Sequence, residues 1–104
     1  MVRLFVLVDV SLPLTRTVNF RAVLQKGHRF QVPRLIRWEF KMEPSQVLRV
    51  SVGLANGYHE EDFFGRMNRD GRITVPKLTL GLLQDRIGGK SLVGCALKVQ
   101  LSPV

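Results

Sequence analysis

The sequence predicts a mostly β fold, a barrel or compact sandwich of about seven strands with two short helices. Short apolar segments alternate with polar residues at the period of two that is typical of strands. Turns that contain Gly or Pro separate these segments, and one segment of the chain occurs twice. A chain of 104 residues, 45% of them hydrophobic, has room for one core. We therefore expect a single domain over residues 1–104.

The duplication emerges when the sequence is shifted by 43 positions. Where residues 20–35 then lie over residues 63–78, the identical pairs are Phe20/Phe63, Arg29/Arg72, Val32/Val75, Pro33/Pro76 and Leu35/Leu78. They fall on positions that would fix the geometry of a turn, a strand and a helix start. We place the first copy at about residues 19–54 and the second at about 62–101. Each copy alone is marginal for an independent core, so we expect the halves to interleave with pseudo-two-fold symmetry.

Both copies predict the same order of elements. A short strand (20–24 and 63–67) leads through a tight turn (25–28 and 68–71) into a return strand (29–32 and 72–75). Asp70-Gly71 is a strong hairpin signal, because Gly reaches positive φ. Proline then suits the first turn of a helix, which predicts short, largely packed helices over 33–42 and 76–84. Long alternating strands over 46–54 and 91–101 end the copies.

The remaining segments lie before and between the copies. Valine at positions 2, 6, 8 and 10 predicts an N-terminal strand over 2–10 rather than a signal peptide. Residues 55–62, which end in Glu60-Glu61-Asp62, are interpreted as a solvated linker. No stretch approaches the roughly 20 apolar residues of a membrane span, so we expect a soluble cytoplasmic protein with no membrane partner.

Charge is the strongest global indication of function. Sixteen Lys and Arg against eight Asp and Glu give a net charge of +8. Seven basic residues but one acid, Glu39, lie between positions 16 and 41. Such an excess on a small surface favours polyanionic partners. The basic residues that flank both predicted turns are the best candidates to contact them.

The stretch from Asp70 to Lys77, DGRITVPK, resembles the signature of the AbrB/SpoVT swapped-hairpin family, and residues 27–37 resemble it more loosely. A chain with two copies is similar to the single-chain RIFT barrels, seen in small archaeal proteins, archaeal riboflavin kinase and translation-factor domains. The resemblance implies a cradle-loop barrel. It also implies two groups of anion-facing residues: Lys26 and Arg29 with Arg34, and Arg69 and Arg72 with Lys77. To these we add Arg37 from the broader basic surface.

An alternative stays open for the two repeated arginines. Arg29 and Arg72 are equally well explained as structural residues that bond carbonyls or carboxylates such as Asp70. Among the aromatic rings, Tyr58 is the one expected to be exposed, which favours contacts to the phosphate backbone over stacking on bases.

Other chemistry finds little support in the sequence. Gly88-Gly89-Lys90-Ser91 lacks the first glycine of a phosphate loop and is interpreted as a helix-ending turn. His28, His59 and the acids at 60–62 are better explained as loop residues than as a metal site. No residues suggest a catalytic nucleophile, and Cys95 lies in an apolar run. We assign no catalytic residue, metal or cofactor.

The sequence therefore predicts a monomeric, non-enzymatic barrel protein that binds DNA or RNA, or a ribonucleoprotein, through phosphates. Two alternatives remain. One is a nucleotide- or flavin-related ligand bound in the cradle, and the other is a module for protein assembly.

Overall fold

The computed structural model describes residues 16–104, so the strand predicted over residues 2–10 lies outside the described part of the chain. The strands and helices are, in chain order, β1 (Val18–Val23), β2 (Arg29–Gln31), α2 (Arg34–Glu39), β3 (Val47–Leu54), β4 (Glu60–Arg66), β5 (Arg72–Thr74), α3 (Lys77–Asp85) and β6 (Ala96–Pro103). The prediction of a mostly β chain with two short helices is confirmed.

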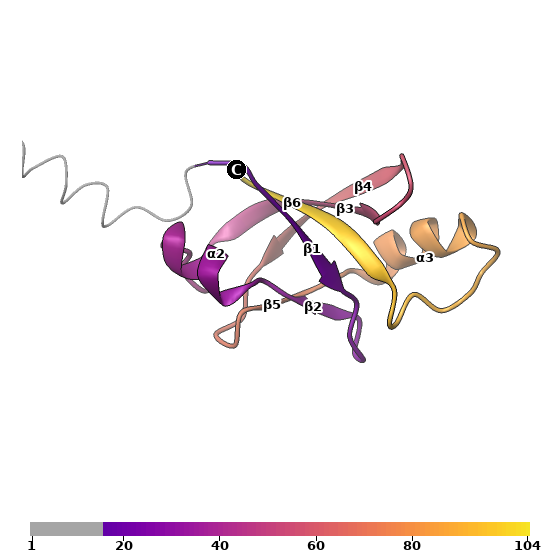
Figure 1. The fold of residues 1–104 in the computed structure, drawn as a ribbon, viewed down its shortest axis with the longest axis horizontal. Coiled ribbons are helices and arrows are strands. Elements are labelled where there is room, and N and C mark those ends of the chain that lie inside the picture. The colour runs from indigo at the N-terminus through magenta and orange to yellow at the C-terminus, as the bar shows by residue number, and fades with distance from the viewer. Residues whose placement is uncertain (1–15) are drawn as a thin grey trace, which may run out of the picture.

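A four-stranded antiparallel sheet forms the larger layer, in the order β1-β6-β3-β4 (Figure 1). The last strands of the two copies, β3 and β6, lie together at its centre, with Val50 opposite Leu101. Each first strand pairs with the last strand of the other copy, so β1 pairs with β6 and β4 pairs with β3. The sheet therefore alternates strands from residues 18–54 with strands from residues 60–103.

The return strands form a separate two-stranded ribbon, in which β2 pairs with β5 in antiparallel register. The sequence predicted that each return strand would fold back on its own first strand. That local pairing amounts to a single bridge between Gln25 and Arg29. Beyond it, β1 runs into the large sheet beside β6. The two return strands are thus left to pair with each other.

Within residues 16–104 the hydrogen-bonded strand pairs do not close into a barrel, because the six strands form two separate sheets. The ribbon has three residues in each strand. Pro33 and Pro76 follow two positions later, and proline has no N–H to extend a ladder. The described part of the chain is thus a two-layer β structure.

One apolar core fills the space between the two sheets and receives side chains from both copies. The alternation along the strands places one face of each strand inward. Phe30 from β2 is fully buried, and its ring centroid lies 6.2 Å from that of Phe20 on β1. The largest fully buried side chains are Phe30, Leu24, Leu48, Ile73, Leu83, Leu92, Leu97, Leu101, Val32, Val50 and Val52. Each stabilises the fold by roughly 1.5–3 kcal/mol relative to an exposed position.

The two helices differ in how they pack. Helix α3 buries Thr79, Leu80 and Leu83. Helix α2 buries none of its residues, which contradicts the expectation of a packed helix over 33–42. The helix ends at Glu39, one turn and a half after it begins, so Met42 reaches the core from the loop instead.

Strand β4 begins earlier than expected. The acids at 60–62, interpreted from the sequence as a solvated linker, form its first three residues and pair with β3 residues 51–53. Cationic neighbours allow this, because Arg49 lies 3.0 Å from Asp62 and Lys98 lies 3.5 Å from Glu60.

In the part of the chain that the structure describes, neither helix is long and apolar enough to cross a membrane.

Candidate nucleic-acid interface

The outward face of the ribbon carries both repeated arginines. Phe30 and Ile73 are opposite each other and fully buried, so the residues on either side of them point away from the core. Arg29 is opposite Thr74, and Arg72 is opposite Gln31. The two arginines therefore occupy diagonal positions of one solvent-facing surface, a proximity that depends on β2 pairing with β5.

The turns lie at opposite ends of this ribbon. The N–H of Val32 donates to the carbonyl of Gly71 at 2.8 Å, which places the start of α2 beside the second turn. Likewise, the N–H of Val75 donates to the carbonyl of His28 at 2.9 Å, which places the start of α3 beside the first turn. In Figure 1, α2 and α3 accordingly lie at opposite ends of the molecule.

This arrangement groups the predicted basic residues across the copies. Arg34 and Arg37 follow β2 and belong to the end that holds Arg69 in the second turn. Lys77 follows β5 and belongs to the end that holds Lys26 in the first turn. The resemblance had implied groups within each copy, but the antiparallel register carries the end of each return strand to the opposite turn.

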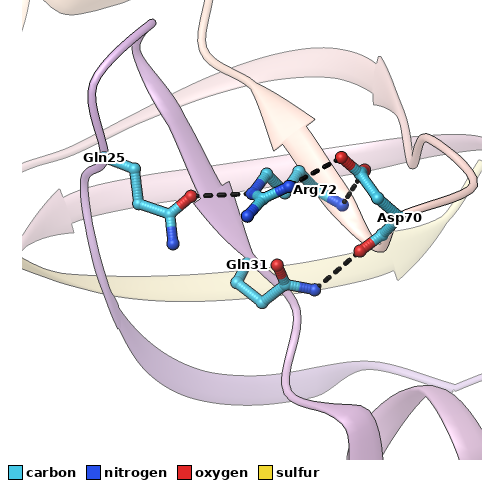
Figure 2. A network of polar contacts seen from close by, with 4 residues as sticks. All are labelled: Gln25, Gln31, Asp70 and Arg72. Atoms are coloured by element: carbon cyan, nitrogen blue, oxygen red, sulfur yellow. Dashed lines mark hydrogen bonds and ion pairs between the residues drawn. The ribbon is translucent and has the colours of Figure 1, made fainter.

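Arg72 is the centre of a polar network that joins the two copies (Figure 2). Its Nη1 lies 2.7 Å from Oδ2 of Asp70, and its Nε donates to Oε1 of Gln25 at 2.8 Å. The backbone N–H of Arg72 donates to Oδ1 of Asp70 at 3.1 Å, and Nε2 of Gln31 donates to the Asp70 carbonyl at 2.9 Å. Arg72 thus makes the contact to the Asp70 carboxylate that the structural explanation of the repeated arginines expects.

Asp70 stays ionised within this network. Hydrogen bonds from the side chain and then the backbone of Arg72 hold the pKa of its carboxyl below the ordinary value, and the charges of Arg72 and Arg29 add to the effect. Asp70 is therefore a permanent anion at neutral pH, and it is compensated locally by two arginines.

Arg37 also has a structural role. Its Nε donates to the carbonyl of Val32 at 3.2 Å. Its guanidinium covers Gly71, because a Cβ at that position would lie 2.5 Å from Cζ of Arg37. These contacts fasten α2 to the second turn.

The other predicted cations remain open to solvent. The exposed residues are Lys26, Arg34, Arg69 and Lys77, while Arg29 is partly buried. Residues 25–37 and 68–77 together carry seven cations and one carboxylate, a surplus of six out of the net charge of +8. The ribbon, its turns and the adjacent helix starts thus carry most of the net positive charge.

Glu60 and Asp62 belong to a different surface, the outer face of the four-stranded sheet, whereas Glu61 lies opposite the buried Val52 on the inner side. Hydrogen bonds from Ser51 and then Arg49 lower the pKa of the Asp62 carboxyl. Glu61 contacts His59, whose Nε2 also lies 2.9 Å from Nη2 of Arg86. These acids are therefore balanced by neighbours and do not offset the charge of the ribbon.

The sequence interpretation missed one exposed ring near the ribbon, Trp38 of α2. Tyr58 is fully exposed, as predicted, but Trp38 is 78% exposed and Phe64 68% exposed. Trp38 was assigned to helix packing because apolar residues are dense over 33–42. A signal was available: the equivalent position in the second copy is Gly81, so the fold does not require an aromatic ring there.

Within residues 16–104, no three His, Cys, Asp or Glu side chains come together as a metal site. Gly88 and Gly89 both have positive φ, and the N–H of Gly89 donates to the carbonyl of Gln84 at 2.8 Å. This geometry confirms the helix-ending turn predicted at residues 88–91.

No protein-family model and no curated protein matches the chain. The fold is similar to the solution structure of PHS018 from Pyrococcus horikoshii, with a TM-score of 0.61 and 21% sequence identity. The likeness covers 88% of this chain and 92% of PHS018. At this identity the comparison concerns the fold alone, and it extends over nearly the whole of both chains.

Proposed function

We propose that this protein is a non-enzymatic nucleic-acid-binding module that holds phosphates on the outward face of β2 and β5. The observation that carries the proposal is the diagonal placement of Arg29 and Arg72 on that face, between two turns that expose Lys26 and Arg69. Guanidinium groups suit phosphate because they offer two parallel donors. The local surplus of positive charge would also attract a polyanion over a longer range.

The network around Arg72 is compatible with this role. Its bonds use Nε and Nη1, while residues 16–104 supply no hydrogen-bond partner for Nη2. A clamped guanidinium loses less side-chain entropy when it binds a phosphate than a free one does. Arg72 would therefore act as a preorganised contact, and Lys26 and Arg69 as mobile ones.

The proposed architecture is a duplicated member of the AbrB-like cradle-loop group that acts as a cytoplasmic monomer. The strand pairing supports a duplication. In the aligned copies, β1 corresponds to β4, β2 to β5 and β3 to β6. If each strand is replaced by its equivalent, the order β1-β6-β3-β4 becomes β4-β3-β6-β1, which is the same order in the opposite direction. A second copy in the chain would then replace the partner subunit of a dimer.

The small-ligand alternative has weaker support. Two shallow hollows of about 320 and 370 Å³ lie on the outer face of the large sheet, and Glu60 and Gln100 border both. The larger hollow holds Glu60 and Asp62 against a single cation, Arg49, which disfavours the phosphates of a nucleotide, and in the smaller one Lys98 already contacts Glu60 and the carbonyl of Gly57. A thermal-shift screen with nucleotides and flavins tests this site, and saturable stabilisation would favour it over the ribbon.

The binding experiment is a salt titration. Fluorescence anisotropy of labelled 20-nucleotide single-stranded RNA, single-stranded DNA and duplex DNA would be measured from low to physiological salt. We expect log K to fall linearly with log salt, with a slope of about −0.7 per phosphate contact on single strands and −0.9 on duplex. A flat dependence, or no binding at low salt, would refute the proposal.

Matched charge variants locate the interface. Lys26→Glu with Arg69→Glu changes both exposed turns, whereas Arg21→Glu with Lys90→Glu makes the same change of net charge at other exposed positions. We expect the turn variant to lose at least tenfold more affinity than the control. Equal losses would mean that net charge alone attracts the nucleic acid.

A further inference from the structure

Trp38 is unusual because a large apolar ring is left in water. It lies in the last turn of α2, is 78% exposed, and is the single tryptophan of the sequence. Leu35, one turn earlier on the same helix, is 71% exposed. Residues three apart in a helix are surface neighbours, so the two side chains form one small apolar patch.

Cations surround this patch. Arg34, Leu35, Arg37 and Trp38 line a hollow of about 490 Å³ on the surface of α2. Arg34 is exposed and lies four residues before Trp38, on the same side of the helix. The site therefore combines an open aromatic face with a free guanidinium.

The hollow has a fixed place relative to the ribbon. Arg37, which lines it, bonds the carbonyl of Val32 and covers Gly71 in the second turn. Arg69 is exposed in the same turn, two residues earlier. The aromatic patch is consequently a continuation of the proposed phosphate-binding surface at one of its ends.

The fold itself gives no reason for the ring. In α3 the corresponding residues are Lys77, Leu78 and Gly81, which keep the spacing of Arg34, Leu35 and Trp38 but lack the ring. A Cβ at Gly81 would meet no atom within 4 Å. The aromatic patch thus belongs to one end of the ribbon only.

We infer that Trp38 is a stacking platform for an unpaired base of single-stranded nucleic acid, while Arg34 and Arg69 hold the neighbouring phosphates. The inference rests on the proposed function and narrows its substrate. An exposed ring among basic residues is the feature by which proteins bind unpaired bases. A duplex keeps its bases stacked on each other and offers no free face to this ring. For the same number of phosphate contacts, a single strand should therefore bind more tightly than duplex DNA.

A protein partner suits this patch less well. Two apolar side chains flanked by two guanidinium groups provide far less than the roughly 800 Å² that each side of a stable interface buries. Cations at the centre of an apolar contact would also lose hydration. Self-association through Trp38 is accordingly the competing outcome of the test.

The single tryptophan allows a direct measurement. Its fluorescence would be followed while a 12-nucleotide single strand is added, in parallel with an abasic strand of the same length and charge. We expect quenching by the strand with bases and little by the abasic strand. Trp38→Ala should weaken single-strand binding in anisotropy by about 5- to 150-fold, whereas Trp38→Phe should retain most of it. Because Trp38 is exposed, Trp38→Ala should have nearly the same free energy of unfolding as the unaltered protein.

The equivalent position in α3 provides a matched control. Gly81→Trp in the Trp38→Phe background moves the only tryptophan to the other end of the ribbon, where no clash is expected. Its fluorescence should respond weakly, because the guanidinium groups of Arg34 and Arg37 beside Trp38 are replaced in α3 by Lys77 and the buried Leu80. Equal quenching at both positions would overturn the inference by showing non-specific contact.

Failure of this inference is distinguishable from failure of the proposed function. Salt-dependent binding that Trp38→Ala leaves within twofold, without quenching, overturns the stacking site and retains the phosphate surface. Absence of binding by any nucleic acid at low salt overturns both. Fluorescence that changes with protein concentration alone, together with a dimer in light scattering that Trp38→Ala abolishes, overturns stacking in favour of self-association.

Discussion

The guanidinium of Arg37 occupies the space where a side chain at Gly71 would begin. A Cβ built on Gly71 would lie 2.5 Å from Cζ of Arg37, while Nε of the same arginine donates to the carbonyl of Val32. Gly71 also has φ of +83°, a region that disfavours residues with a Cβ. One glycine thus serves both the second turn and the docking of α2.

Gly71→Ala should therefore destabilise the protein more than Gly27→Ala. Both positions have left-handed φ, so each alanine costs about 1–2 kcal/mol from backbone strain. At Gly27 the new Cβ would lie 3.5 Å from Nε of Arg29, an ordinary contact. At Gly71 it would displace Arg37 and break its bond to Val32, which adds about 1 kcal/mol. Urea unfolding of the two variants measures the difference.

The Arg37→Ala background isolates the cause of that difference. Without the guanidinium, the two glycine substitutions should cost the same within about 0.5 kcal/mol. If Gly71→Ala remains the more damaging one, the overlap with Arg37 does not explain its cost.

The bond between Arg72 and Gln25 predicts an energetic coupling between the two copies. The residues are 47 positions apart and meet at 2.8 Å, in a partly buried site. A double-mutant cycle with Gln25→Ala and Arg72→Ala should give a coupling energy of about 1 kcal/mol. Additive effects of the two substitutions on the free energy of unfolding would show that this bond contributes nothing.

The lowered pKa of Asp70 predicts a pH-dependent contribution to stability. The carboxylate is favoured in the folded state, so its contribution is present above the unfolded pKa, about 3.9, and is lost as pH falls through the folded value. Asp70→Asn should have a lower free energy of unfolding than the unaltered protein from pH 7 to about pH 5, and this difference, the stability gap, should disappear below about pH 4. Urea unfolding of both proteins at pH 7, 5 and 3 measures the gap.

Arg72 is the main cause of that lowered pKa, so an Arg72→Gln background serves as the control. In it, Asp70→Asn should cost less at pH 7 than it does in the unaltered protein. A gap that persists unchanged at pH 3 would contradict the assigned role of the carboxylate.

Local sequence signals predicted the described elements well but not their partners. The turns at 25–28 and 68–71 and the helices after Pro33 and Pro76 follow from Gly and Pro chemistry, which acts within a few residues. The pairing of β2 with β5 depends on where β1 and β4 go, and no local residue determines that. The sequence therefore identified the basic turns but grouped them within the copies.

Two errors in the sequence interpretation have the same physical origin. Trp38 was expected to pack because apolar residues surround it, yet α2 ends at Glu39 and buries none of its residues. Glu60 and Asp62 were expected in a loop because they are charged, yet Lys98 and Arg49 lie beside them in the folded sheet. In both cases the environment of the side chain depends on segments that are distant in sequence, which a local pattern does not reveal.

Substitution of each repeated arginine separates its structural role from its role in binding. Arg72 bonds Asp70 and Gln25, whereas Arg29 acts on Asp70 through its charge. Arg72→Gln should therefore lower the free energy of unfolding by about 1–2 kcal/mol, and Arg29→Gln by less than about 0.5 kcal/mol. If both contact phosphates, each should reduce the salt slope of single-strand binding by about 0.7. A slope that changes for Arg29→Gln alone would assign Arg72 to the fold and leave phosphate binding to Arg29 and the exposed turn cations.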